Sequence, residues 1–349
     1  MKVIAWPAFK TKHKNPYNWL LYSQIVKQGV TVTEFSLSKL LRQEYHIFHL
    51  HWAMETIVRH PNRAVAALRA IAMLLAIDWV RARGTKIIWT IHDRRPHSLL
   101  HPQLAAWFQS EFVKRVDGCI SHCQASKEWA MSTWTYLSDR PHTIIPHGHY
   151  REFYPNSISC ETARANLDIP SEYHLLLFLG YIDCYKNVPH LVRIFRELAP
   201  TNWMLLVAGK LEVPELGAQI SEAAGNDFAV RLKFGYIPDE QLQTYFKAAS
   251  LVVLPFQEIL NSGSTLLALS FNCPVLVPEE GGMAELQEQV GQNWLKLYQG
   301  ELTTEVLKLG LEWALEQGRS PQANLEQLEW SILGQQTIET YENIVNFYS

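Results

Sequence analysis

The stretch from residue 251 to 285 constrains the fold most, because short apolar runs and polar loops alternate in it. Residues 251–254 and 274–277 are apolar runs of the kind that form buried strands. Each is followed by a loop with glycine or serine and then by a helical segment. A helix N-terminus after such a loop presents free N–H groups and the positive end of the helix dipole to a ligand. Two such loops predict a site for a nucleotide diphosphate, although ordinary connecting loops give the same pattern.

Length and composition allow two packed domains. The chain has 349 residues, of which 48% are hydrophobic and 19% charged. Its longest uncharged apolar run, residues 70–77, is too short to span a bilayer. Residues 1–6 are typical of a first strand and too short for a signal peptide. Five scattered cysteines complete no zinc pattern and favour reduced thiols, so we expect a cytoplasmic protein.

Charge divides the chain into a basic and an acidic part. Residues 1–155 hold 20 Lys and Arg against 10 Asp and Glu, whereas residues 156–349 hold 11 against 24. The basic part indicates an anionic partner, either a membrane surface, a lipid phosphate or a nucleic acid. No nucleic-acid motif accompanies it, so we expect no nucleic-acid partner. The helical pattern of residues 62–83 predicts a core helix with basic ends or a helix that faces anionic lipid on the inner side of the cytoplasmic membrane.

Strands and helices alternate in two successive runs, which a linker at residues 151–156 joins. The strands expected in the first run cover residues 2–6, 30–35, 47–51, 86–91, 118–122 and 143–146. Those of the second run cover residues 174–179, 203–208, 230–234, 251–254 and 274–277. This alternation predicts the α/β class, with two doubly wound domains that face each other.

Polar side chains gather where two strands of the first run end. Residues 49–52 read His-Leu-His-Trp, and residues 92–97 read His-Asp-Arg-Arg-Pro-His. Ligands of open α/β sheets bind at the carboxyl ends of the strands. Histidines beside an acid and two basic residues suit substrate recognition or proton transfer. A lone histidine is more often structural, whereas this cluster at this edge favours function.

An ordered set of motifs resembles the glycosyltransferase family 4 type of GT-B glycosyltransferase. The motifs cover nearly the whole chain in this order: TIHD, IPHG, FLGYIDCYKN, FGYIPDEQL, ASLVVLPF and ALSFNCPVLVPEEGG. The resemblance implies two facing Rossmann-like domains with a cleft between them. Residues 1–152 would hold the acceptor, residues 153–329 the donor, and a helix at about residues 330–349 would cross back to the first domain.

The resemblance also implies the reaction. Such enzymes move a hexosyl group from a UDP- or GDP-sugar to a glycan, a lipid-linked acceptor or a small molecule, and most retain the configuration at the sugar carbon. No cofactor beyond the nucleotide sugar is expected. No metal is expected either, because no acidic pair of the DxD kind stands at a strand end. If the enzyme inverts instead, Asp93 or a nearby histidine would serve as the base.

Matching the motifs residue by residue gives a candidate site. Lys186 matches the lysine that meets the diphosphate, and His92 matches the histidine beside the donor sugar. The residues proposed for catalysis are His92, Asp93, Lys186 and Glu258. Those proposed for donor binding are Gly180, Lys186, Gly209, Lys210, Tyr236, Ile237, Glu258, Asn261, Ser262, Gly263, Ser264 and Thr265. Those proposed for acceptor binding are Asn15, Tyr17, His51, Arg94, His97 and His147.

Two departures from the family pattern stand out. The usual arginine near Lys186 is absent, and the second glutamate of the family's pair is replaced by Leu266 or Leu267, depending on the alignment. A leucine cannot bind a ribose diol, so residues 261–264 or the glutamates at 279 and 280 would take that role. The same departures fit a non-catalytic subunit that binds a nucleotide sugar. An epimerase or phosphorylase with this fold is a weaker alternative, because the expected carboxylate set and Schiff-base lysine are missing.

Overall fold

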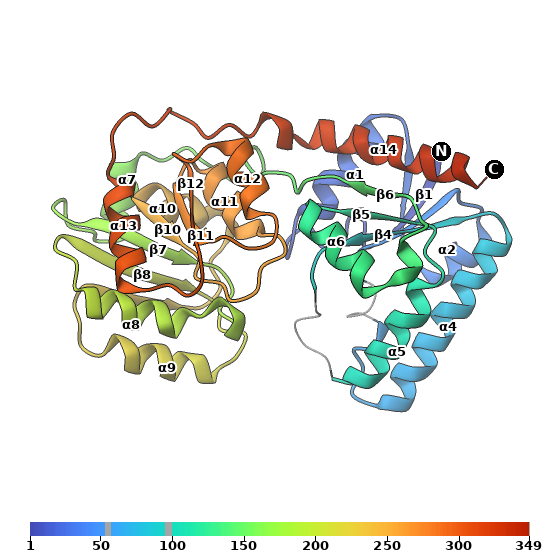
Figure 1. Cartoon of the computed structure of the whole chain (residues 1–349), viewed down its shortest axis with the longest axis horizontal. Coiled ribbons are helices and arrows are strands. Elements are labelled where there is room, and N and C mark those ends of the chain that lie inside the picture. Colours follow the sequence, from blue (N-terminus) through green and yellow to red (C-terminus); the bar gives the residue numbers. More distant parts are fainter. Residues whose placement is uncertain (53–56, 95–99, 349) are drawn as a thin grey trace. The chain divides into compact units, whose positions relative to one another are not determined.

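The computed structural model describes residues 1–52, 57–94 and 100–348. Contacts divide the chain into two compact units, Met1–Gly148 with Leu328–Ser349, and His149–Gln327. The junctions after residues 148 and 327 lie a few residues before the expected ones, after 152 and 329. The C-terminal helix thus belongs to the first unit, although the whole second unit precedes it in the chain (Figure 1).

In the described part of the first unit, parallel strands form a sheet with the order β2-β1-β3-β4-β5-β6. The strands are β1 (Lys2–Trp6), β2 (Thr31–Glu34), β3 (Ile47–Leu50), β4 (Lys86–Ile91), β5 (Gly118–Ser121) and β6 (His142–Ile144). The central strands β3, β4 and β5 are buried almost throughout, as is typical of parallel strands covered on both faces.

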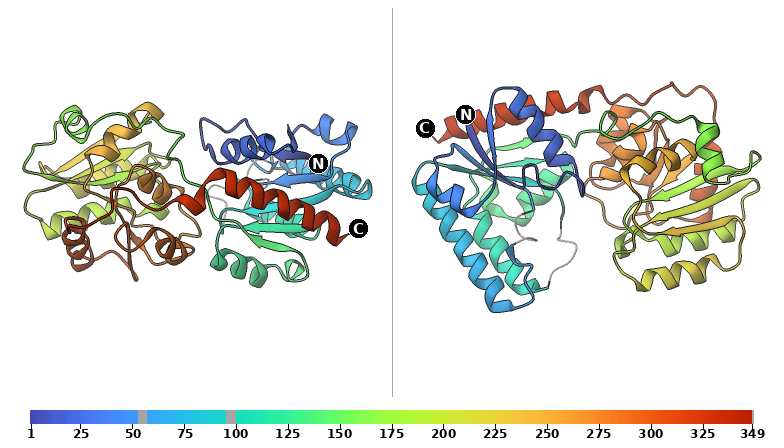
Figure 2. Two further views of the ribbon diagram at one scale, coloured as in Figure 1. Left: turned by 90° about the horizontal axis from the view of Figure 1, so that it is seen from above. Right: turned by 180° about the vertical axis from the view of Figure 1, so that it is seen from behind.

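Helices cover both faces of this sheet. Figures 1 and 2 show α1 and α14 on one face and α4, α5 and α6 on the other. The helices of this unit are α1 (Tyr17–Lys27), α2 (Leu37–Arg42), α4 (Arg63–Ala82), α5 (Pro102–Val113), α6 (Gln124–Thr133) and α14 (Trp330–Phe347). Asn62 begins α4 because its side chain accepts hydrogen bonds from the first free N–H groups, those of Ala64 and Val65.

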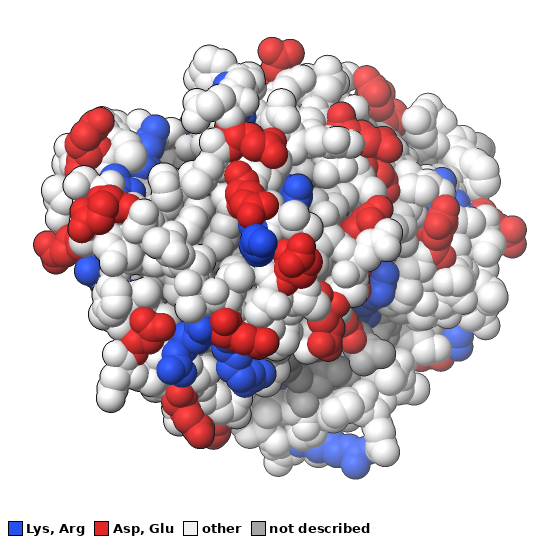
Figure 3. Space-filling model, turned by 60° about the vertical axis from the view of Figure 1, so that its left-hand side comes forward, with Lys and Arg blue, Asp and Glu red and all other residues white. Residues whose placement is uncertain are grey.

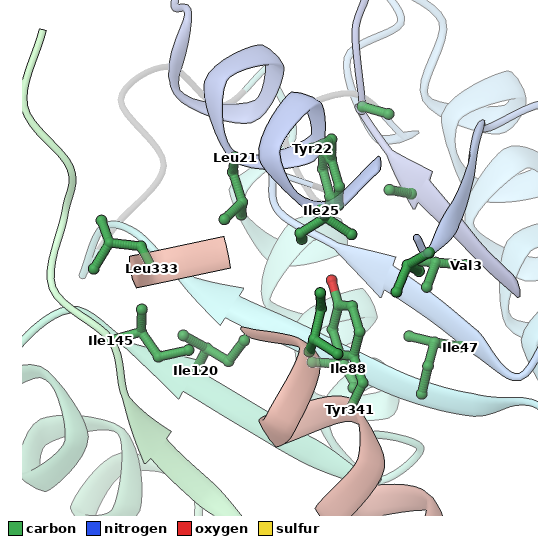
Figure 4. Close-up of a cluster of buried hydrophobic side chains, with 14 of the residues drawn as sticks. Val3, Leu21, Tyr22, Ile25, Ile47, Ile88, Ile120, Ile145, Leu333 and Tyr341 are labelled. Atoms are coloured by element: carbon green, nitrogen blue, oxygen red, sulfur yellow. The ribbon is translucent and has the colours of Figure 1, made fainter. Parts of the chain in front are cut away.

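Side chains of α1 and α14 meet over the sheet and form the core of the first unit (Figure 4). Tyr22 and Tyr341 are fully buried there. Ile344 of α14 packs so tightly on β5 that a β-carbon on Gly118 would overlap its side chain. The strands contribute apolar residues on this face, among them Val3, Ile47, Ile88 and Ile120.

The second unit repeats the design with the strand order β12-β11-β10-β7-β8-β9, again parallel. Its strands are β7 (His174–Leu179), β8 (Trp203–Gly209), β9 (Val230–Phe234), β10 (Leu251–Val253), β11 (Val275–Pro278) and β12 (Leu295–Tyr298). Its helices are α7 (Cys160–Asn166), α8 (Val188–Leu198), α9 (Glu215–Ala224), α10 (Leu242–Ala248), α11 (Gly263–Ser270), α12 (Met283–Val290) and α13 (Thr304–Ala314). Figure 3, which brings the side of this unit forward, shows acidic side chains spread over its surface with basic ones among them.

Most expected elements are present within one or two residues of their expected bounds, and the α/β class with two parallel sheets is confirmed. Four further elements, α2, α7, α9 and β12, were not predicted from the sequence. The first three are short helices of 6, 7 and 10 residues, so their periodicity gave little signal. No helix in the described ranges is long and apolar enough to cross a membrane.

Substituting Ile344 tests how far the first unit depends on α14. We expect Ile344→Ala to lower the free energy of unfolding by about 2–5 kcal/mol, because it leaves a cavity between α14 and β5. Urea unfolding followed by circular dichroism measures this loss. Glu342→Ala, an exposed position on the same helix, is the control. Equal effects of the two substitutions would show that α14 is not part of the core.

Candidate active site

Each sheet has a switch point, which is a pair of neighbouring strands from which the chain continues to opposite sides of the sheet. In the second unit this point lies between β7 and β10, because β8 pairs with one side of β7 and β10 with the other. Ligands of open α/β sheets bind outside the carboxyl ends of the strands at such a point. Two loops follow these strand ends, residues 180–187 and 254–262. The N–H of Gln257 donates to the carbonyl of Tyr185 at 2.8 Å and ties the loops together.

Two glycines at the strand ends leave space beside β7. Gly180 and Gly209 have φ angles of 146° and 144°, which residues with a side chain rarely adopt. A β-carbon on Gly209 would overlap the carbonyl oxygen of Gly180. A β-carbon on Gly180 would lie 3.4 Å from Nζ of Lys186 and 3.9 Å from Oγ of Ser264. The space beside Gly180 is therefore bordered by an amino group and by the start of α11.

Lys186 is the buried cationic side chain of this site, with 6% of its surface exposed. Its Nζ lies 5.4 Å from the ring centre of Phe256, and within the described chain it has no ion-pair or hydrogen-bond partner. Burial lowers the pKa of Lys186 to about 8, while the charges of Asp183 and Glu212 act in the opposite direction. A buried ammonium group without a partner is costly, so this position suits an anionic ligand.

The N-terminus of α11 lies beside Lys186. Ser262 caps the helix, since its hydroxyl accepts from the N–H of Thr265 at 3.1 Å and from the hydroxyl of Thr265 at 2.8 Å. These two hydroxyls are therefore engaged in the cap. The N–H groups of Gly263 and Ser264 have no partner in the described chain, and they point from the positive end of the helix. They are the groups of residues 261–265 best suited to bind a phosphate.

The positions for the family's carboxylates differ in exposure. Glu258 is exposed, whereas Leu266 is only 3% exposed and belongs to the packed face of α11. Glu279 and Glu280 are exposed in the loop after β11. Gly281 brings that loop against the β10 loop, because a β-carbon there would lie 2.5 Å from two of its carbonyl oxygens.

The remaining residues predicted to bind the donor lie at the ends of β8 and β9. Tyr236 is 57% exposed, and Ile237 is half-buried beside it. Nζ of Lys210 lies 3.7 Å from a carboxylate oxygen of Glu212, with both side chains largely exposed.

In the first unit the corresponding point lies between β1 and β3, and histidines gather there. His51, His92 and His122 directly follow the ends of β3, β4 and β5. His49 points inward from β3 itself, and all four side chains are buried. The ring of Tyr17 meets the edge of the His92 ring, with 4.9 Å between the ring centres and planes 90° apart.

Hydrogen bonds link these histidines in a continuous buried chain. His49 Nε2 contacts Thr90 Oγ1 at 2.7 Å, and His49 Nδ1 contacts the hydroxyls of Tyr22 at 2.9 Å and Tyr341 at 2.7 Å. The Tyr22 hydroxyl lies 2.7 Å from His51 Nε2. The chain then continues through His51 Nδ1–His92 Nε2 at 2.9 Å, His92 Nδ1–His122 Nε2 at 3.2 Å and His122 Nδ1–Ile145 O at 2.9 Å. We call this series the histidine chain.

Burial keeps these imidazoles neutral. It lowers the pKa of His49 to about 3 and that of His122 to about 4, and it lowers the pKa of His51 and His92 well below the usual value. His147, whose Nδ1 donates to the carbonyl of Gly148 at 2.7 Å, has its pKa lowered to about 3 by burial as well.

The other acceptor candidates are placed as follows. The side-chain oxygen of Asn15 accepts from the N–H of Tyr17, the first residue of α1, at 3.0 Å. Tyr17 is 3% exposed, and its hydroxyl has no hydrogen-bond partner in the described chain. Arg94 is exposed, whereas His97 lies outside the described residues. Tyr17, His51 and His147 therefore share one cluster of rings.

Sequence reasoning missed most of the histidine chain, namely Tyr22, His49, Thr90, His122, Ile145 and Tyr341. A signal for part of it was present. A histidine stands at or soon after the end of each of the neighbouring strands β3, β4, β5 and β6. Among the described residues, no group of three or more His, Cys, Asp or Glu side chains is arranged to hold a metal ion.

Comparison with known proteins places the chain in a family. Residues 159–320 match the family model of "Glycosyl transferases group 1". A GDP-mannose:glycolipid 4-beta-D-mannosyltransferase of Xanthomonas campestris pv. campestris is 30% identical over 329 residues, which are 94% of this chain and 88% of the relative. The chain belongs to this family of glycosyltransferases.

Solved structures agree on the fold. Sucrose-phosphate synthase from Thermosynechococcus elongatus matches with a TM-score of 0.61 and 16% identity, covering 100% of this chain and 96% of the other. Anabaena Alr3699/HepE in complex with UDP-glucose matches with a TM-score of 0.63 and 12% identity, covering 100% and 99%. The chain is therefore a glycosyltransferase with the GT-B fold, as its motifs predicted.

The buried histidines make the folded protein sensitive to acid. Their pKa values are lower in the folded than in the unfolded chain, so the unfolded chain binds more protons at acid pH. The stability is full above pH 6.5, the ordinary value, and falls as the pH decreases toward 3–4, the folded values of His49 and His122. Each such histidine lowers the free energy of unfolding by up to about 1.4 kcal/mol per pH unit in this window.

Urea unfolding between pH 7.5 and 5 measures this slope. We expect His49→Gln to make the slope shallower by up to one proton, whatever it does to stability at pH 7.5. The exposed His13, changed to Gln, is the control. A slope that both variants leave unchanged would contradict a neutral, buried His49.

Proposed function

We propose that this glycosyltransferase moves a hexosyl group from a nucleotide diphosphate sugar to a glycolipid acceptor. The observation that carries the proposal is the unpartnered amino group of Lys186 beside the free N–H groups at the start of α11. The name of the Xanthomonas relative supports GDP-mannose as the first donor to test and a glycolipid as the first acceptor. In this proposal the second unit binds the donor and the first unit binds the acceptor.

The proposed donor site acts on the leaving group. As the bond between the sugar carbon and the diphosphate oxygen breaks, negative charge develops on the diphosphate. Lys186 and the N–H groups of Gly263 and Ser264 would stabilise that charge, since they are fixed in a site from which much of the water is excluded. We propose that these groups make a divalent metal unnecessary and that no cofactor besides the nucleotide sugar takes part. Transfer that continues in EDTA would support this.

The other donor contacts are proposals of the same kind. Tyr236 and Ile237 would frame the base, because both lie at the end of β9 with exposed surface. The ribose hydroxyls need carboxylate or carbonyl acceptors, and Glu258, Glu279 and Glu280 are exposed on the two loops that Gly281 brings together.

The stereochemical outcome has two candidates. The family resemblance favours retention, in which case no general base is needed. The relative's name specifies a β-linked product, and a β product from a donor whose sugar is α-linked requires inversion. Inversion needs a base for the acceptor proton, and Asp93 is the carboxylate at the end of β4. The linkage named for the relative therefore supports inversion in this chain.

Titration of Lys186 provides a test of the donor site. Its amino group is charged below a pKa of about 8, so we expect the affinity for GDP to fall at higher pH, roughly tenfold between pH 7 and 9. Lys186→Met should weaken GDP binding at least about tenfold at pH 7, because a charge-assisted hydrogen bond is lost. Lys186→Arg should bind with little dependence on pH in this range.

Calorimetry with GDP, UDP and ADP measures these affinities, and release of the nucleotide from GDP-mannose with a lipid-linked glycan acceptor measures transfer. Lys308→Met, an exposed lysine of α13, is the control. The proposal fails if none of the nucleotides binds, or if Lys186→Met binds as tightly as the unchanged protein.

The helix α4 suggests how the first unit reaches a lipid-linked acceptor. One of its faces is buried in the core, and the opposite face carries exposed apolar side chains: Leu68 at 66%, Ile71 at 44%, Leu75 at 63% and Trp79 at 55%. Arg59, Arg63 and Arg69, near its start, are exposed and have no ion-pair partner in the described chain. We propose that this face binds the anionic inner surface of the cytoplasmic membrane.

Flotation with vesicles that contain phosphatidylglycerol tests this surface. We expect binding that weakens at high salt, because the charges are exposed. Changing Leu75 and Trp79 together to serine should weaken binding at least about tenfold through the lost apolar insertion. Phe228→Ser, which removes a 74% exposed aromatic ring from the second unit, is the control. Absence of any salt-sensitive binding would overturn the membrane proposal.

A further inference from the structure

The histidine chain ends at a group that can only accept a hydrogen bond. His122 Nδ1 lies 2.9 Å from the carbonyl oxygen of Ile145, so this nitrogen must carry the proton. In a neutral imidazole the other nitrogen is then an acceptor. His122 Nε2 therefore accepts from His92, whose Nδ1 lies 3.2 Å away and must carry a proton.

The same argument passes from His92 to its next neighbour. His92 Nε2 is an acceptor and lies 2.9 Å from His51 Nδ1, which must then donate. His51 Nε2 becomes an acceptor for the hydroxyl of Tyr22 at 2.7 Å. One carbonyl thus determines the proton positions on three histidines, and every bond from Tyr22 to Ile145 has one donor and one acceptor.

His92 uses both ring nitrogens in this chain, so neither is available to take a proton from a substrate. One face of its ring is covered by Trp52, with 4.1 Å between the ring centres and planes 22° apart. The indole N–H of Trp52 donates to a carboxylate oxygen of Asp93 at 3.3 Å. Trp52 thus links the two residues, since it donates to the carboxylate of Asp93 and stacks on the His92 ring.

We propose that the histidine chain makes His92 a positioning residue with a fixed tautomer, which holds Trp52 and through it orients Asp93 as the base that accepts the acceptor proton. This inference rests on the proposed function in its inverting form. In that reaction the acceptor hydroxyl oxygen forms a bond to the sugar carbon, and the bond to the diphosphate breaks. The electron pair leaves with the diphosphate, and the hydroxyl proton passes to the carboxylate of Asp93.

Burial supports the fixed proton positions. It lowers the pKa of His51, His92 and His122, so none of them is protonated near neutral pH and each keeps one N–H. The sequence alone gives a different emphasis, since it places His92 and Asp93 together among the catalytic candidates. The geometry separates their roles.

Nuclear magnetic resonance of protein labelled with ¹⁵N-histidine tests the tautomers without any substrate. At pH 7.5 we expect protonated Nδ1 and unprotonated Nε2 on His51, His92 and His122. Signals are assigned by comparing single-histidine variants. A protonated Nε2 on His92, or a charged imidazolium on any of the three, would overturn the proposal.

Activity measurements test the link to Asp93. Trp52→Phe keeps an aromatic ring for stacking but removes the N–H donor, so we expect kcat to fall roughly tenfold or more with the KM for the donor unchanged. Asp93→Asn should lose at least as much, since an amide cannot take the proton. Trp107→Phe, on the exposed face of α5, is the control. Full kcat in Trp52→Phe or in Asp93→Asn would contradict the proposal.

Two substitutions of His122 complete the test. His122→Gln places a carbonyl oxygen near the position of Nε2 and should preserve the His92 tautomer and most of kcat. His122→Phe removes the acceptor, so we expect the Nδ1–H signal of His92 to shift or disappear and kcat to fall. If His122→Phe does not fold, the histidine resonances of the unchanged protein and the kcat of Trp52→Phe still test the proposal.

Failure of the proposed function gives a different pattern. If the unchanged protein neither binds nucleotide nor transfers sugar, the donor proposal is wrong, whereas the histidine tautomers are measured independently. If nucleotide binds, sugar is transferred with retention and Asp93→Asn is fully active, the transferase function holds and this inference is wrong.

Discussion

The cost of burying a polar group without a partner governs both units of this protein. In the second unit no described partner offsets that cost. Lys186 is 6% exposed, has no partner in the described chain and lies beside a helix start whose N–H groups are also unpaired. The electrostatic free energy of these groups is therefore unfavourable in the folded chain, and a bound anion would lower it. In the proposed function, a diphosphate would pair with the ammonium and with the N–H groups together, and binding would then supply the partners that folding does not.

The first unit meets the same constraint in the opposite way. Its histidine rings are buried at the sheet edge, yet each link of the histidine chain from Thr90 to Ile145 pairs a nitrogen or hydroxyl with a neighbour. In such a network every hydrogen bond has its donor on the same side. Moving the proton of one imidazole to its other nitrogen would place two donors opposite each other, so the network holds its members rigidly. The satisfied, rigid network therefore lies in the first unit, and the unsatisfied groups lie in the second.

Local patterns in the sequence predicted the repeated elements and the loops that carry the site. Apolar runs predicted β10 and β11, which are present, and the polar loop before α11 predicted an anion site, which stays a prediction. The hydrogen bonds within the candidate site could not be predicted from the sequence, for a physical reason. The hydrogen bond between the hydroxyls of Ser262 and Thr265 depends on the geometry of the helix cap. The contacts among His51, His92 and His122 depend on the register of three neighbouring strands. The residue types alone predict neither the cap bond nor the histidine contacts, although a histidine at each strand end is a partial signal for those contacts.

The leucine at the expected carboxylate position follows from the packing of α11. Of the two leucines that the alignments place there, Leu266 is 3% exposed and Leu267 is half-buried, so a glutamate in place of Leu266 would put a charge in the apolar interior. In the proposed function, an exposed loop would then bind the ribose. Glu279 and Glu280 meet that requirement, and the close approach at Gly281 holds their loop against the one that contains Glu258.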